Sequence, residues 1–126
     1  ACRAGKKTPF CSGDEEPHLA RVGWYRGNSG DRLHEVGEKD PNVFGLYDMH
    51  GNIWEWCEDD WHGSYEGAPK DGSAWVDKTR GSARVARGGA FLNPPAVCRS
   101  AFRFKAVAVG RNKVLGFRVA VPLIGR

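Results

Sequence analysis

The glycine and tryptophan content constrains the fold of this chain more than any other feature of its sequence. Seventeen glycines and five tryptophans stand among 126 residues. Glycine weakens helix interiors and tolerates the backbone angles of tight turns. This content therefore indicates many turns around an aromatic core, with little long helix. The length suits one domain with a buried core. No apolar run approaches the roughly 20 residues of a membrane helix, so membrane insertion is not expected.

One segment carries a clear strand pattern. Residues 53–61 ("IWEWCEDDW") begin with large apolar residues alternating with charged ones, which is typical of a half-buried strand. Residues 8–42 and 62–82 are rich in Gly, Pro, Asn and Asp and are expected to form long loops. Weaker strand patterns cover 84–91, 100–104 and 115–121. The sequence thus predicts a single α+β domain over residues 1–126, mostly β and loop-rich.

The charges and cysteines leave alternatives open. Ten acidic and two basic residues lie between Asp31 and Glu66, whereas eleven basic residues and no acid follow Asp77. A basic half is compatible with nucleic acid or acidic ligands; alternatively, the two halves pair within the fold. The cysteines show no zinc-like spacing. Free buried thiols are expected, with a disulfide between Cys2 and Cys11 as the alternative in an exported protein. The four cysteines are Cys2, Cys11, Cys57 and Cys98.

Several separated motifs resemble one known family. They are "FGLYDMHGNIWEW", "DW", "RVARGG", "RSAFR" and "GFRVA", in this order. Together they resemble the sulfatase-modifying-factor or formylglycine-generating-enzyme family, and the resemblance covers roughly residues 1–120. It implies a C-type-lectin-like fold of the formylglycine-generating-enzyme type. In this family "ACRAG" at residues 1–5 would end a helix at Gly5 that follows an upstream half-domain. The chain is therefore expected to be the C-terminal portion of a family domain that lacks an upstream N-terminal part, or a minimal version of that domain.

The resemblance also bears on catalysis. Formylglycine-generating enzymes use two cysteines, five residues apart, soon after the Gly-Gly, to bind copper and oxidise a substrate cysteine. Here Asn93 stands at the first position and Cys98 is the remaining thiol. Soft thiolates suit Cu(I), so the loss of one ligand disables such a site. The prediction is a non-catalytic domain. The alternative is a copper oxidase of this type, or another enzyme of the family, that acts through Cys98 with a missing half-domain. The histidines show no metal-binding pattern and are expected in loops or at the surface: His18, His34, His50 and His62.

The segment from Arg87 to Arg118 resembles the variable proteins of diversity-generating retroelements. Their order of Arg-Gly-Gly, Cys-Arg-Ser-Ala, Arg, Arg and Gly-Phe-Arg occurs here. Between these fixed motifs lies an irregular mixture of apolar and basic residues, and an exposed patch of that kind usually marks a binding site. The predicted function is ligand binding through a diversified face over residues 91–114. The residues predicted to form it are Phe91, Leu92, Asn93, Pro94, Val97, Phe102, Phe104, Lys105, Ala106, Val107, Asn112, Lys113 and Val114.

The amino-acid composition of this segment partly tests its resemblance to the segment of a diversified variable protein. Randomising the adenines of an Asn codon yields no Met, Trp, Glu, Gln or Lys. The first four are absent between Gly88 and Arg118, whereas Lys105 and Lys113 do not fit. Leu115, Phe117 and Val119 follow the segment and are expected to pack inside.

The partner is expected to be a protein or a surface ligand. An extracellular, cell-surface or virion-surface location is favoured. Nucleic-acid binding by the basic C-terminal half is a further alternative. Against it stands the interpretation that the framework arginines have partners inside the fold. These are Arg84, Arg87, Arg99, Arg103 and Arg118.

The acidic motif "DMHGNIWE" predicts a calcium site. Asp48 and Glu55 supply hard carboxylate oxygens, and Gly51 allows a tight path that turns carbonyls inward. The family resemblance implies structural calcium held by the side chains of Asp48 and Glu55 and the carbonyls of Gly51 and Ile53. The alternative is that Glu55 pairs with a buried arginine, Arg87 or Arg118.

Overall fold

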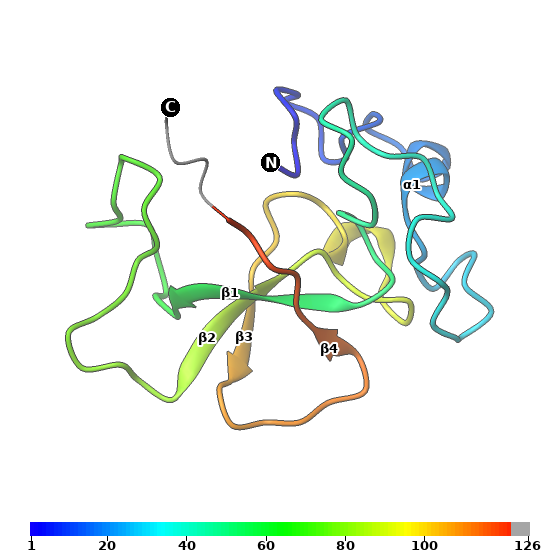
Figure 1. The fold of residues 1–126 in the computed structure, drawn as a ribbon. Helices are drawn as coiled ribbons and strands as arrows, with labels where there is room; N and C mark the ends of the chain where they lie inside the picture. The colour runs from blue at the N-terminus through cyan, green and yellow to red at the C-terminus, as the bar shows by residue number, and fades with distance from the viewer. Residues whose placement is uncertain (122–126) are drawn as a thin grey trace.

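Four short strands and one short helix organise the chain. The computed structural model describes residues 1–121 (Figure 1). Strands β1 and β2 and strands β2 and β3 are antiparallel, whereas β4 runs parallel to β1, in the order β3-β2-β1-β4. The prediction of a mostly β, loop-rich chain is confirmed. The elements are α1 (Glu16–Val22), β1 (Trp54–Asp60), β2 (Ala83–Arg87), a 3-10 helix (Pro95–Val97), β3 (Phe104–Val107) and β4 (Leu115–Gly116).

Strand β1 is the element that the alternating pattern predicted, and it lies between β2 and β4 in the sheet. Trp54 and Asp60, at its two ends, are both buried. Its partner β2 stops at Arg87 because Gly88 and Gly89 adopt φ values of +97° and +77°. A Cβ atom on Gly89 would lie 2.6 Å from the Sγ atom of Cys98. The predicted strand 84–91 is therefore too long, because the paired glycines turn the chain.

Three other local predictions need correction. Strand β3 begins at Phe104, where the predicted strand 100–104 ends, because turns occupy residues 99–101. Residues 1–5 form a turn rather than the end of a helix, since the N–H of Ala4 donates to the carbonyl of Ala1. Helix α1 lies in a predicted loop region. There the N–H of Glu15 donates to Nδ1 of His18 in a capping box, and Leu19 is buried.

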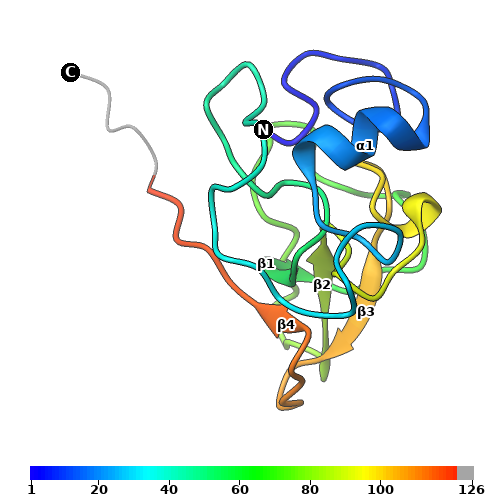
Figure 2. The ribbon, with the colours of Figure 1, turned by 90° about the vertical axis from the view of Figure 1, so that its right-hand side faces the viewer.

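Buried apolar side chains form two clusters. One consists of Phe10, Leu19, Tyr25 and Cys98. The other, on the sheet, consists of Trp54, Ala86, Ala90 and Ala106. Figure 2 shows α1 at one end of the molecule and the loop between β3 and β4 at the opposite end.

The segment after β4 departs from prediction. Leu115 is half-buried, but Phe117 and Val119 are 77% and 80% exposed rather than packed inside. The reason is that β4 ends at Gly116 and the chain then runs away from the sheet (Figures 1 and 2). These apolar side chains find no cover among the described residues.

Ion pairs join the acidic and basic halves of the chain. Asp60, whose side chain is 2% exposed, lies 2.7 Å from Arg84 and 3.2 Å from Arg80. The N–H of Asp77 donates to the same carboxylate and, with these arginines, lowers its pKa. The four cysteines are free thiols. Within residues 1–121, no helix has the length and apolar character of a membrane span.

Candidate functional site

Side chains from the predicted variable segment gather around Trp54 on one face of the sheet. The ring of Phe104 stacks on Trp54 at 5.0 Å between centroids, and the ring of Phe102 lies 5.9 Å away. Val97 and Val114 pack against the same cluster and stay partly exposed. We call the surface formed by Val97, Phe102, Phe104 and Val114 the Trp54 face. It brings together residues that are up to 17 positions apart in the sequence.

Other predicted contact residues reach the surface outside this face. Leu92 and Val107 are 39% and 58% exposed. Lys105 lies on β3 and is exposed, as are Asn112 and Lys113 on the loop before β4. A segment that mixes apolar and basic residues is thus largely at the surface, where a partner can contact it.

Phe91 and Ala106 must be removed from the predicted contact set because they are 6% and 4% exposed. The N–H of Phe91 donates to the carbonyl of Asn52, and its carbonyl accepts from the Ser29 hydroxyl, so this residue is held inside. Ala106 belongs to the cluster around Trp54.

Asn93 and Pro94 are half-buried. The side-chain oxygen of Asn93 accepts from the N–H of Ala90, which stabilises its own turn.

The framework arginines have partners within the fold. Arg87 donates to the carbonyls of Ser100 and Phe102 and to the Tyr65 hydroxyl. The Arg103 guanidinium lies over the ring of Tyr65 at 4.4 Å. Internal carbonyls, carboxylates or rings also contact Arg84, Arg99 and Arg118. These contacts agree with the interpretation that the framework arginines have partners inside the fold.

Cys98, the thiol left at the position of the enzymes' cysteine pair, is deeply buried. Its side chain is in the cluster with Leu19 and Tyr25, and its exposed fraction is 0%. Burial raises the pKa of the thiol to about 12. Thiolate, the form that binds metal and attacks substrates, is therefore scarce at neutral pH.

The four predicted calcium ligands line one cavity of about 270 Å³: Asp48, Gly51, Ile53 and Glu55. Positive φ values of 55° at Asp48, 84° at Gly51 and 64° at Asn52 fold the motif into this shape. Oδ2 of Asp48 accepts the N–H of Gly37 at 2.8 Å. Its Oδ1 is buried and has no partner among the described residues. An orphaned carboxylate oxygen is a group that a hard cation satisfies.

Glu55 has a cationic partner in this structure. The Arg118 guanidinium donates to both carboxylate oxygens, each at 2.6 Å, and to the carbonyls of Tyr47 and Asp48. The bond to Glu55 raises the pKa of Arg118. Pairing of Glu55 with Arg118 is one of the two pairings that the sequence analysis gave as the alternative to calcium binding. The described residues hold no group of three or more His, Cys, Asp or Glu side chains placed to bind one metal ion, so calcium here would depend on backbone carbonyls.

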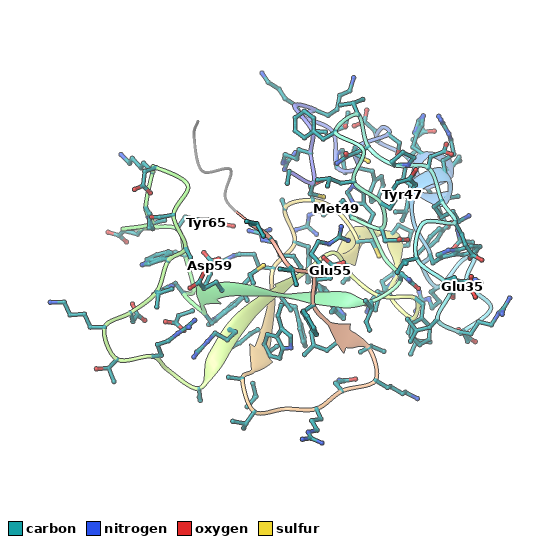
Figure 3. The ribbon with its side chains drawn as sticks, viewed as in Figure 1. Glu35, Tyr47, Met49, Glu55, Asp59 and Tyr65 are labelled. Atoms are coloured by element: carbon teal, nitrogen blue, oxygen red, sulfur yellow. The ribbon has the colours of Figure 1, made fainter. Side chains whose placement is uncertain are left out.

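The structure also shows a larger cavity that the sequence did not predict. It measures about 420 Å³, and Met49, Glu55 and Arg87 are among its lining residues. Figure 3 shows Met49 and Glu55 on this side of β1 and Tyr65 on the neighbouring loop. Burial raises the pKa values of the lining thiols of Cys2 and Cys57. No motif marks this cavity, because separate segments contribute its walls: Cys2, Met49, Glu55, Trp56, Cys57, Glu58, Arg87, Gly88, Ser100, Arg118 and Ala120.

Comparison with known proteins places this geometry in a family. PvdO from Pseudomonas aeruginosa is 38% identical, with a TM-score of 0.83 over 92% of this chain and 46% of PvdO. Treponema denticola variable protein 1 is 32% identical, with a TM-score of 0.75 over 92% of this chain and 41% of that protein. The formylglycine-generating enzyme of Thermomonospora curvata is 40% identical over 62 residues, which are 46% of this chain and 20% of that enzyme.

The chain thus spans less than half the length of each of these proteins. The similarity to the variable protein and to the enzymes confirms the fold expected from the motifs, a C-type-lectin-like domain of the formylglycine-generating-enzyme type. The model of the sulfatase-modifying factor enzyme 1-like domain matches residues 1–123. The chain therefore belongs to the sulfatase-modifying factor enzyme 1-like family.

Proposed function

We propose that this chain is a non-catalytic binding domain that presents residues 91–114 to a protein partner as a retroelement-diversified face. The observation that carries the proposal is the Trp54 face, where aromatic and aliphatic side chains of the segment surround one buried tryptophan and remain partly exposed. Exposed apolar groups on a rigid sheet bind with little loss of conformational entropy. The likeness to a variable protein supports the same function.

Two further observations favour binding over catalysis. The Cys98 thiol is buried and protonated at neutral pH, and Asn93 stands where a second cysteine would be needed. The side chain of Asn93 is engaged with the N–H of Ala90. Retention of the fold without the cysteine pair is compatible with binding through the surface, because one scaffold supports many functions.

The test is to sequence this locus from many cells of the source population. We expect substitutions to concentrate at exposed positions such as Leu92, Phe104, Lys105 and Val107. Buried Phe91 and Ala106 should vary less, because core volume is constrained. The region 53–61 in the same reads is the internal control. Uniform variation along the gene, or an invariant segment 91–114, would contradict the proposal.

We further propose that the cavity at Asp48 holds structural calcium. A ligand that binds only the folded state stabilises it against unfolding. At a calcium concentration 100 times its Kd, this stabilisation is about 2.7 kcal/mol. Removing calcium with a chelator should therefore lower Tm by several degrees. Glu55→Ala should abolish the chelator sensitivity, and Glu58→Ala, on the same strand but outside this cavity, should keep it. The measurement is a thermal melt with and without chelator. An identical wild-type melt in both conditions would sink the calcium proposal.

A further inference from the structure

Strand β3 is a free edge of the sheet. The strand order places β2 between β3 and β1, and Figure 2 shows β3 on the outer side of β2. Apart from the ladder with β2, the backbone of Phe104–Val107 makes one described hydrogen bond, in which the N–H of Gly110 donates to the carbonyl of Val107. The outer N–H and C=O groups of a strand in this position are available to an extended segment of another polypeptide.

The side chains of β3 point to two sides of the sheet. The Phe104 ring stacks on Trp54, and Ala106 lies in the same cluster, so both point to the side of Trp54. Successive side chains of a strand alternate, so Lys105 and Val107 point to the opposite side. Phe104 and Val107 are 43% and 58% exposed, and Lys105 is exposed as well. A strand added beside β3 would therefore meet an aromatic ring on one side and a lysine and a valine on the other.

The charge of the proposed contact segment indicates the chemistry of its partner. No acidic residue follows Asp77 in the sequence. Arg84 and Arg118 have carboxylate partners, but within the described part of the chain no carboxylate pairs with the exposed basic side chains of residues 91–114. An acidic partner would neutralise these charges, and such complementarity favours one partner over others. The basic side chains in question are Arg99, Lys105, Arg111 and Lys113.

A second copy of this chain is a poor occupant of the edge. Pairing β3 with the β3 of another copy would bring two Lys105 side chains to one ladder of four-residue strands, and like charges opposite each other are destabilising. Lysine on an edge strand is one of the means by which proteins prevent such self-pairing. An acidic residue beside Lys105 replaces this repulsion with an opposite-charge pair.

We propose that a partner polypeptide adds a strand to the outer edge of β3, with an apolar side chain beside Phe104 and an acidic one beside Lys105. The inference rests on the proposed function, because it specifies how the segment 91–114 binds its protein partner. The backbone hydrogen bonds of an added strand are the same whatever side chains the segment carries, whereas the exposed side chains of β3 select the partner. A diversified edge strand thus keeps one mode of binding while its specificity changes.

The experiment selects random linear peptides displayed on phage against the purified chain. We expect the enriched peptides to alternate apolar and acidic residues, and a synthetic enriched peptide to slow amide exchange at residues 104–107. The nitrogens of a strand face its two neighbours alternately. N-methylation of one alternate set of peptide nitrogens should therefore weaken binding about tenfold, because hydrogen bonds with β3 are lost. N-methylation of the other set should leave binding nearly unchanged.

A charge reversal tests the acidic position of the peptide. Lys105→Glu should weaken binding of the enriched peptide about fivefold, because an opposite-charge pair becomes a like-charge pair. Lys6→Glu is the matched control, since Lys6 is also exposed and undergoes the same change of charge on the turn at residues 1–7. Its effect should stay below about twofold, because salt screens distant charges. The fold should survive both changes, since both side chains are exposed.

Three results would overturn strand addition. They are the absence of enriched peptides, equal binding of the two N-methylated forms, and an equal loss of binding in Lys6→Glu and Lys105→Glu. Peptides that lose binding in Phe104→Ala but are indifferent to N-methylation would overturn strand addition and leave the Trp54 face as the binding surface. An invariant segment 91–114 at the locus is a separate result, which contradicts the diversified face whatever the peptides show.

Discussion

Gly51→Ala is expected to remove a large part of the folding free energy. Gly51 has a φ of +84°, and a Cβ atom there would lie 2.1 Å from the carbonyl oxygen of Trp24. That backbone is fixed, since the same oxygen accepts the N–H of Asn52 and the N–H of Gly51 donates to Gly88. Strain at a positive φ costs about 1–3 kcal/mol, and overpacking costs about 1–3 kcal/mol more. Together, about 2–6 kcal/mol is comparable with the whole stability of a marginal domain.

Gly45→Ala is the matched control for this prediction. Its φ of +75° is similar, but nothing lies within 4 Å of an added Cβ atom. The alanine at this position should therefore show the strain contribution alone, about 1–3 kcal/mol. Urea unfolding followed by circular dichroism measures both variants. If Gly51→Ala loses no more stability than Gly45→Ala, the contact with Trp24 is not a constraint.

His50→Phe is expected to destabilise the fold by about 2–4 kcal/mol. The ring of His50 is 0% exposed, with Nδ1 2.8 Å from the carbonyl of Cys98. Its Nε2 accepts the N–H of Cys11 at 3.1 Å, so the proton belongs on Nδ1. Phenylalanine keeps a ring of similar volume beside Phe10. It leaves the donor of Cys11 and the acceptor of Cys98 without their partner, and unsatisfied buried groups are destabilising.

His62→Phe is the control for loss of a histidine's hydrogen bonds where water is close. His62 stacks on Trp75 at 3.6 Å, and its side chain is 20% exposed. Phenylalanine preserves the stacking, and water can replace the partners, so the loss should stay below about 1 kcal/mol. Denaturant midpoints compare the two variants. Equal losses would show that the hydrogen bonds of His50 add no net stability and that its role is to fill volume.

The strongest local patterns predicted structure well. Alternation in residues 53–61 predicted β1 because a half-buried strand needs that pattern whatever packs on it. Strand 84–91 was predicted to continue through Gly88 and Gly89, since a propensity argument cannot see that the Cys98 side chain occupies the space beside Gly89. Helix α1 was missed because seven residues stabilised by a capping box leave little periodicity.

The predicted sites were less complete, for a related reason. His50 lies in a loop, as expected, but it is buried between Cys11 and Cys98, which no local pattern of residues indicates. The 420 Å³ cavity was not predicted because its walls come from separate segments. In contrast, the four residues predicted to bind calcium line one cavity, because they lie within one tight turn and the strand that follows; calcium binding itself stays a prediction.

The sequence by itself determined the class of fold, strand β1 and the family, and it predicted the segment that we propose as the contact face. Ordered motifs and side-chain alternation express these properties locally. Only the tertiary structure decided which apolar residues of that segment face solvent. It buried Phe91 and Ala106, left Phe104 and Val107 at the surface, and exposed Phe117. Burial depends on which elements pack over a residue, and those elements are brought there by contacts between residues that are distant in the chain.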